Sequence, residues 1–364
     1  MRLLIDAHED LGWNMLTFGR DYTRPALWTR AQEAGTSIPA NNGDTLLGQS
    51  EWLLGHVGVI FATLFVSPER RRLGEWDVQC YRDSGEAAEK AGHQLDAYHR
   101  LVDVNEVFRF IGTQVDLEEV LGTWEDGRTL PDRRIGIVPL MEGADPVLEP
   151  QQIEEWFERG VRIVGLSWEA TRYAGGTHEP GGLTPEGIEL LEQMADLNML
   201  LDLSHLAEES YWDAIDRYPG VAIVSHANPR RFLPTTRGLS DDMIRALAER
   251  DGVMGIVPFN RFLDSDWHAG DPKAKVPLLT LVDVIDHICQ VTGSAAHVGI
   301  GTDFDGGFGM QHTPQGIDTI DDLWKLQGPL LERGFSDEQI AGIFAGNWLR
   351  MLRRGLPGDI SIAG

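Results

Sequence analysis

Short, nearly continuous hydrophobic runs recur along the chain. Most lack the alternation of polar and apolar residues that marks a strand with one face in water. Runs of this length, rich in Val, Ile and Leu, are typical of parallel strands buried on both faces. We therefore predict eight buried strands, at residues 3–8, 57–66, 135–143, 161–168, 199–205, 221–227, 252–259 and 297–305.

Helical patterns separate several of these runs. Thr184 and Ser240 are good N-cap residues, and each precedes an amphipathic stretch with acidic residues in its first turn. Gly160 and Gly252 are typical helix ends. The clearest predicted helices span residues 84–102, 151–160, 184–198 and 240–252.

Strands that alternate with helices predict an α/β fold, and eight such units predict a (β/α)8 TIM barrel. The pattern is clearest between residues 135 and 305 and more irregular between 67 and 134. We expect a single domain over residues 1–364, with an extra helical insertion allowed within 67–134.

Composition and charge exclude several classes of partner. The chain is 42% hydrophobic and 24% charged, with 31 basic and 57 acidic residues, so its net charge is −26. A strongly acidic protein is a poor ligand for nucleic acid or anionic membranes. The longest apolar run, residues 57–66, is too short to span a membrane. The chain has only two cysteines, Cys80 and Cys289, and we expect a cytoplasmic location.

Potential metal ligands follow five of the predicted strands. The carboxyl ends of all strands in a TM barrel meet on one face, where the catalytic residues lie. Each ligand alone has an ordinary explanation, as a hydrogen-bonded histidine or a turn aspartate. Together they predict a site for two divalent metal ions, because imidazole and carboxylate groups bind such ions. The residues are His8, Asp10, Glu142, His205, His226, Asp303 and Asp305.

Five ordered motifs give this chain a resemblance to a known family. They are "DAHEDLGWN" (6–14), "PLMEGADP" (139–146), "LLDLSHLAEESYWDAI" (200–215), "AIVSHANPRRFLPTTRGLSDDMI" (222–244) and "VGIGTDFDG" (298–306). This set resembles the membrane dipeptidase, or renal dipeptidase-like, family of amidohydrolase-type barrels. The resemblance covers nearly the whole chain.

The resemblance implies a role for each metal ligand. His8 and Asp10 would bind one ion, His205 and His226 would bind the other, and Glu142 would bridge the two.

The same resemblance implies how the substrate is handled. Asp303 would manage the proton of the attacking water, and Arg237 would bind the substrate carboxylate, with Arg230 and Arg231 as rival candidates. Asp305, two residues beyond Asp303, is counted among the substrate-binding residues because alternate residues of a strand share a side.

Two positions depart from the family pattern. Trp168 stands where a substrate-contacting histidine is expected, and an indole N–H donates a hydrogen bond but carries no charge. Trp168 is therefore either a contact residue or a packing residue of the mouth. Phe259 stands near the position of a family tyrosine, so a hydroxyl group is missing there.

The resemblance implies a metallo-dipeptidase that cleaves the amide bond of small dipeptides, including those ending in a D-residue, through a metal-bridging hydroxide. Zn²⁺ is the first choice of metal, with Mn, Fe and Co also compatible with these ligands. The alternative is a related amidohydrolase that acts on N-acyl amino acids or lactones, which Trp168 leaves open. A third hypothesis, a binding barrel without catalysis, predicts a missing ligand. A homodimer is compatible with the sequence.

Overall fold

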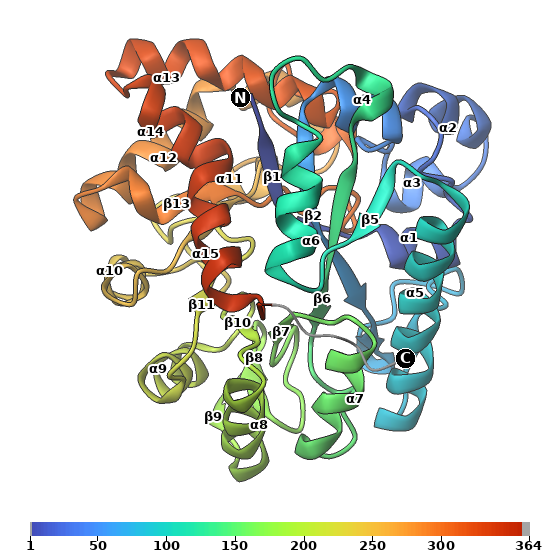
Figure 1. Ribbon diagram of the computed structural model, residues 1–364, viewed down its shortest axis with the longest axis vertical. Coiled ribbons are helices and arrows are strands. Elements are labelled where there is room, and N and C mark those ends of the chain that lie inside the picture. The colour runs from blue at the N-terminus through green and yellow to red at the C-terminus, as the bar shows by residue number, and fades with distance from the viewer. Residues whose placement is uncertain (1, 359–364) are drawn as a thin grey trace.

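The centre of the molecule is a nearly closed barrel of eight parallel strands (Figure 1). The structure is a computed structural model that describes residues 2–358. Around the barrel the strands run in the order β11-β10-β7-β6-β2-β1-β13-β12, and a bridge between Val224 and Met254 brings the two ends together. Each of the eight predicted runs contains one of these strands, so the predicted (β/α)8 fold is confirmed. The barrel strands are β1 (Leu4–Glu9), β2 (Val57–Phe65), β6 (Ile135–Glu142), β7 (Ile163–Gly165), β10 (Leu200–Asp202), β11 (Ala222–Ile223), β12 (Met254–Ile256) and β13 (Val298–Ile300).

Five short strands lie outside the closed path. The first half of β6 pairs with β5, whereas its second half pairs with β7. Strands β3 and β4 form one small parallel pair, and β8 and β9 form an antiparallel hairpin beside the mouth. These strands are β3 (Ser67–Pro68), β4 (Cys80–Tyr81), β5 (Phe108–Phe110), β8 (Ala174–Gly176) and β9 (Glu179–Leu183).

Helices surround the barrel on its outer side (Figure 1). No helix within residues 2–358 is long and apolar enough to cross a membrane. The helices are α1 (Leu11–Thr17), α2 (Ala26–Glu33), α3 (Ile38–Asn42), α4 (Gln49–Leu54), α5 (Ser84–Val104), α6 (Gln114–Gly122), α7 (Ile153–Glu158), α8 (Pro185–Asp196), α9 (Glu208–Arg217), α10 (Asp241–Glu249), α11 (Asn260–Leu263), α12 (Leu279–Thr292), α13 (Gln327–Arg333), α14 (Asp337–Ala341) and α15 (Asn347–Gly355).

The predicted N-caps hold in the structure, and one predicted helix end does not. The Thr184 side chain accepts a hydrogen bond from the Gly187 amide, and Ser240 caps α10 in the same way. The left-handed residue after α10 is Asp251, with φ 57°, and not Gly252. Gly252 is instead needed for packing, because a Cβ there would lie 2.4 Å from the Leu247 side chain.

The irregular segment 67–134 contains α5, α6 and β5. Helix α5 follows β2 in the chain and packs against α1, while α6 packs against β5 and β6. The single-domain prediction for residues 1–364 stays a prediction, and residues 1 and 359–364 lie outside the part that the structure describes.

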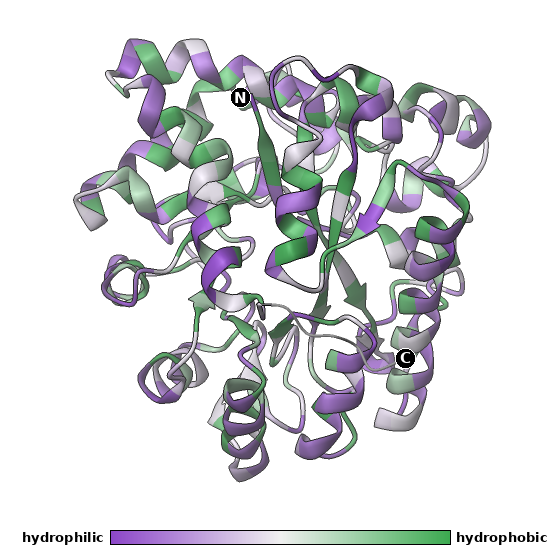
Figure 2. Ribbon diagram, in the orientation of Figure 1, coloured by the Kyte–Doolittle hydropathy of each residue, from purple (hydrophilic) through white to green (hydrophobic). Residues whose placement is uncertain are grey.

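Alternate residues of the strands fill the interior of the barrel, and hydrophobic residues dominate the central strands (Figure 2). In β1, Leu3, Ile5 and Ala7 belong to this inner cluster. The pairing of β1 with β2 shifts register between Asp6 and Glu9. An irregularity of one residue moves the following side chains to the other face of a strand. This shift accounts for why His8, which follows Ala7 directly, also faces the interior.

Candidate metal centre

Three histidines and one glutamate meet at the carboxyl ends of the barrel strands. His8 lies in β1, Glu142 ends β6, His205 follows β10 and His226 follows β11. The His8 Nε2 atom is 3.4 Å from Glu142 Oε2. The Nε2 atoms of His205 and His226 are 3.2 and 3.5 Å from Glu142 Oε1. One carboxylate therefore faces three imidazole nitrogens, with one oxygen turned to His8 and the other to the pair.

The contacts among these side chains leave ligand atoms unsatisfied. The His8 Nε2 atom is fully buried and has no hydrogen-bond partner among the described residues. The Nε2 atoms of His205 and His226 lie 2.9 Å from each other. Buried polar atoms are rarely left unpaired. A divalent cation bound by these nitrogens satisfies them, so the donor set fits a metal ion of the Zn²⁺ class.

Two aspartates complete the centre on the side of β1 and β13. His8, Asp10 and Asp303 each have a ligand atom within 4.8 Å of the others. Thr63 donates a hydrogen bond of 2.5 Å to Asp10 Oδ1. A Cβ at Gly306 would lie 2.3 Å from Asp303 Oδ1 and 2.4 Å from Asp10 Oδ2. Only glycine at this position leaves room for both carboxylates.

Burial and mutual charge perturb the pKa of the three histidines and the two aspartates of the centre. Burial, and after it the nearby charge of Glu142, raises the pKa of Asp10 to about 7. Burial likewise holds the pKa of Asp303 well above its usual range. Burial lowers the pKa of His8, but the charges of Glu142, Asp10 and Asp303 outweigh it and raise the value to about 9.

The pKa values of His205 and His226 are shifted in the opposite direction, downward. Burial holds the pKa of His205 and His226 well below the usual range, and the positive charges of Arg237 and His8 act in the same direction. Both rings are therefore neutral near pH 7, which is the form that binds a metal.

The metal centre opens into a cavity of about 630 Å³. Asp10, Glu142, His205 and Asp303 line its floor, whereas His8 and His226 are covered. A volume of this size is typical of small-molecule sites.

Arg237 lines the same cavity and is only 6% exposed. Its Nη2 atom donates a 2.6 Å hydrogen bond to the His226 carbonyl, while Nε and Nη1 have no partner among the described residues. The rivals lie elsewhere, since Arg230 pairs with Glu208 at 2.9 Å and Arg231 lies 3.5 Å from His287. Of the three candidates, the structure places only Arg237 at the cavity.

Aromatic side chains form much of the cavity wall. Trp168 lines the cavity, meets Phe65 edge-on at 5.2 Å between ring centroids and lies 6.2 Å from the His205 ring. Phe259 stacks on Phe308 at 4.4 Å. Both positions that depart from the family pattern therefore face the cavity.

The prediction that Asp305 binds substrate is wrong. Its side chain is fully buried and does not line the cavity. Its carboxylate accepts hydrogen bonds from Arg20 at 2.9 Å, Tyr22 at 2.7 Å, Thr45 at 2.6 Å and the Leu46 amide at 3.1 Å. Asp303 and Asp305 both have positive φ, 59° and 65°. Strand alternation does not apply to such a loop, and the two carboxylates diverge.

The sequence interpretation missed the polar residues behind the histidines. Asp202 lies under the centre, where it accepts hydrogen bonds from Ser225 and Ser204. Thr177, in the turn of the β8–β9 hairpin, contacts His205 Nδ1 at 2.7 Å. The only signal for Asp202 is a charged residue within the apolar run 199–205.

Comparisons with known proteins agree with this geometry. A family model for the membrane dipeptidases (peptidase family M19) matches residues 2–355. Dipeptidase aclJ of Aspergillus oryzae is 28% identical over 343 residues, covering 90% of this chain and 75% of that protein. An uncharacterized protein in the pqqA 5′ region of Klebsiella pneumoniae is 30% identical over 236 residues, covering 62% and 84%.

Solved structures share the fold. A metallopeptidase from Rhodobacter sphaeroides, liganded with a phosphinate mimic of the dipeptide L-Ala-D-Ala, has a TM-score of 0.77 at 21% identity and covers 97% of this chain and 99% of that one. The probable dipeptidase PvdM from Pseudomonas aeruginosa has a TM-score of 0.78 at 20% identity, with coverage of 97% and 95%. The chain therefore belongs to the membrane dipeptidase family, peptidase family M19, and is a metallo-dipeptidase, a hydrolase that uses a divalent metal.

Proposed function

We propose that this enzyme hydrolyses the peptide bond of free dipeptides with two divalent metal ions, Zn²⁺ before Mn, Fe or Co. His8, Asp10 and Glu142 would hold one ion, and Glu142, His205 and His226 would hold the other. The observation that carries the proposal is one cavity that contains both the metal centre and the buried, partly unpaired guanidinium of Arg237. A short substrate with a free carboxylate fits that pairing.

Bound divalent ions polarise a substrate carbonyl and lower the pKa of a nearby water. Asp303 would accept the proton of the attacking water and return it to the leaving amine. Its buried position supports this role, because a carboxyl whose pKa is raised can exist in the acid form near neutral pH.

Arg237 would fix the register of the substrate. A guanidinium binds a carboxylate through strong charge-assisted hydrogen bonds, and Arg237 Nε and Nη1 have no partner among the described residues. The third nitrogen is held by the His226 backbone, so the carboxylate-binding group is tied to a metal ligand. This link sets the distance between the substrate's carboxyl end and the bond to be cleaved.

The aromatic wall favours a second candidate, a deacylase for N-acyl amino acids or a lactonase. Trp13, Phe65 and Trp168 line the cavity, and an acyl chain would pack against such rings. The same rings also accommodate an apolar N-terminal residue, so the requirement for a free amine decides between the candidates.

Initial rates with the metal-loaded enzyme test both candidates. The panel contains L-Xaa-L-Xaa dipeptides, L-Xaa-D-Xaa dipeptides and the N-acetyl form of each. The proposal expects cleavage of the free dipeptides and slow or absent cleavage of the acylated ones. Cleavage of the acylated compounds alone would contradict the dipeptidase proposal and favour the deacylase.

A cytoplasmic location and a homodimer remain predictions. Cys80 and Cys289 are both free thiols, which is compatible with a reducing compartment.

A further inference from the structure

We propose that the Ser225 hydroxyl, oriented by Asp202, is a positioning group shared by His8 and His226. In this role it sets which ring nitrogen each histidine turns toward the metal, so one serine prepares a ligand for each of the two proposed ions. The inference rests on the metal centre of the proposed function and concerns residues behind it.

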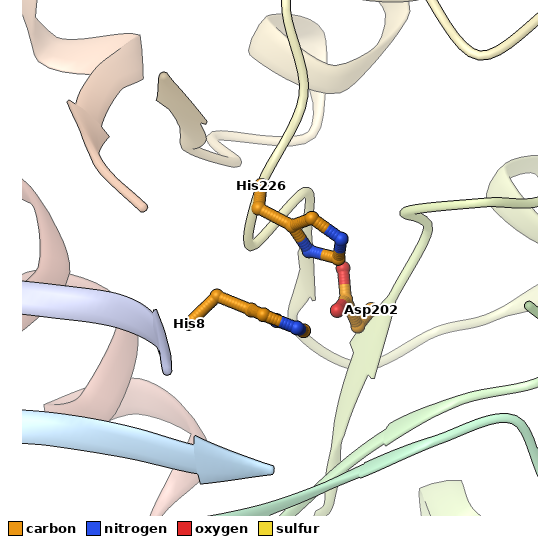
Figure 3. Close-up of side chains that lie close together, drawn as sticks. All are labelled: His8, Asp202 and His226. Atoms are coloured by element: carbon orange, nitrogen blue, oxygen red, sulfur yellow. The ribbon is translucent and has the colours of Figure 1, made fainter. Parts of the chain in front are cut away.

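The contacts converge on one oxygen atom. Ser225 Oγ lies 3.1 Å from His8 Nδ1, 2.8 Å from His226 Nδ1 and 2.5 Å from Asp202 Oδ2. All three partners are at most 1% exposed. Figure 3 shows the three side chains arriving from different elements, with His8 from β1, Asp202 from the end of β10 and His226 from the loop after β11.

A third metal ion among these three residues is not needed to explain their proximity. His8, Asp202 and His226 have ligand atoms close enough to hold an ion. The Ser225 oxygen, however, is already within hydrogen-bond distance of each of them. The hydroxyl therefore accounts for the cluster.

The direction of the protons follows from the donors around Asp202. Its Oδ1 accepts hydrogen bonds from the Ser204 amide at 3.0 Å, the Ser204 hydroxyl at 2.7 Å and the Ser225 amide at 2.9 Å. An ionised carboxylate only accepts, so the Ser225 hydroxyl proton points to Oδ2. A hydroxyl has one proton and two lone pairs. The Ser204 hydroxyl also lies 3.2 Å from Ser225 Oγ but donates to Asp202 at 2.7 Å, so both lone pairs of Ser225 are left to accept from the histidine Nδ1–H groups.

With a divalent ion bound, this arrangement would turn the Nε2 lone pairs of His8 and His226 toward that ion, on the side of Glu142. The two rings also pack on each other, with centroids 3.6 Å apart. Groups behind metal-binding histidines commonly fix the ring tautomer and orientation in this way. What is unusual is that the two histidines share a single acceptor, which couples the two metal positions.

Ser225→Ala tests the inference, and Ser204→Ala is the matched control. Both serines donate to Asp202, but the Ser204 hydroxyl otherwise contacts the His226 amide and the Ser225 hydroxyl, and no imidazole ring among the described residues. Apparent Zn²⁺ affinity is measured for each ion by competition with a chelator. We expect Ser225→Ala to lower the Zn²⁺ affinity of both metal positions by about 10- to 100-fold. The affinity of Ser204→Ala should stay within about threefold of the parent.

The histidine tautomers give a second readout that is independent of activity. In ¹H–¹⁵N NMR of the Zn²⁺-loaded parent, His8 and His226 should both show protonated Nδ1. Asp202→Asn keeps the volume but offers an amide donor to Ser225, so the hydroxyl proton turns toward one histidine. That variant should lose the Nδ1–H signal of one ring and bind metal more weakly.

Three results would overturn the inference. The Ser225→Ala variant could keep the parent's Zn²⁺ affinity for both ions, it could lose affinity for only one ion, or Ser204→Ala could lose as much Zn²⁺ affinity as Ser225→Ala. The failure is distinct from a failure of the proposed function. If the parent itself binds no divalent metal, the proposed function fails. If parent and Ser225→Ala bind it equally well, only the shared role of Ser225 fails.

Discussion

At the scale of single residues, the mouth of the barrel is marked by buried polar atoms that lack a hydrogen-bond partner among the described residues. Nε2 of His8 and two nitrogens of Arg237 are buried and have no hydrogen-bond partner within residues 2–358. Leaving a buried polar group unpaired costs about 1–3 kcal/mol. In the proposed function a metal ion and a substrate carboxylate would satisfy these atoms, so the same groups that destabilise the empty protein would provide its binding energy.

Glu142→Gln should remove the carboxylate that faces all three histidines. Because an amide is a weaker ligand and carries no charge, we expect metal content to fall to background and dipeptide hydrolysis to fall more than about 100-fold. Elemental analysis of the purified variants measures the first effect. Glu169→Gln is the matched control, since Glu169 is also buried in the cavity wall but pairs with His178 and Arg71. Equal metal content in both variants would contradict the assignment.

Arg237→Met should raise KM for free dipeptides by about 10- to 100-fold, the range for a lost charge-assisted hydrogen-bond pair. The effect should shrink for dipeptide amides, which lack the carboxylate. Arg230→Met, at the rival position that pairs with Glu208, should leave KM within about twofold. An equal loss on acids and amides would show that Arg237 does not bind the carboxylate.

At the scale of elements, the strands were predictable and the loops at their ends were not. Continuous apolar runs mark strands buried on both faces, so even β11, two residues long, lies within a predicted run. The β8–β9 hairpin was not predicted, since its glycine-rich sequence has no hydrophobic period. It nevertheless carries Thr177 to His205.

The candidate metal ligands could be proposed because each lies at or just after the end of a predicted strand, and a strand end has a defined place in a barrel. The error at Asp305 has the same origin. Strand alternation was extended into a loop whose backbone is left-handed at Asp303 and Asp305. Residues such as Asp202 and Ser225 were missed because their role depends on contacts between distant segments.

The loop after β13 should depend on Asp305 for stability and not for substrate binding. Asp305→Asn removes one of the two carboxylates that pair with the buried Arg20 guanidinium, the other being Glu33, and breaking a buried ion pair costs about 3–5 kcal/mol. Urea unfolding of the metal-free protein measures this loss. Asp318→Asn, which removes the exposed pair with Lys273, should cost at most about 1 kcal/mol. Similar losses in both variants would contradict the structural role of Asp305.

At the scale of the whole molecule, protons and metal compete for the same centre. In the metal-free protein the pKa of Asp10 is raised to about 7 and that of His8 to about 9. A group whose pKa is higher in the folded state stabilises the fold below its unfolded pKa and loses that contribution as pH rises through the folded value. For Asp10 the loss runs from about pH 4 to 7, and for His8 from about pH 6.5 to 9.

The lowered pKa values of His205 and His226 act in the opposite direction below about pH 6.5, but the raised pKa values of His8, Asp10 and Asp303 outweigh them. The metal-free protein should therefore unfold at a lower temperature at pH 8.5 than at pH 5.5. Added Zn²⁺ should reverse the order, because the ion replaces the protons and binds best to deprotonated ligands. Thermal unfolding with chelator and with Zn²⁺ at the two pH values measures both effects. A larger Zn²⁺-induced rise in unfolding temperature at pH 5.5 than at pH 8.5 would contradict this account of the centre.

The most direct test of the central claim is the rate of dipeptide hydrolysis against the number of metal ions added per stripped chain. We expect no activity in the stripped enzyme and a rise to a plateau at two ions per chain. Full activity in the stripped enzyme, or a fully loaded enzyme that cleaves no free dipeptide, would contradict the account.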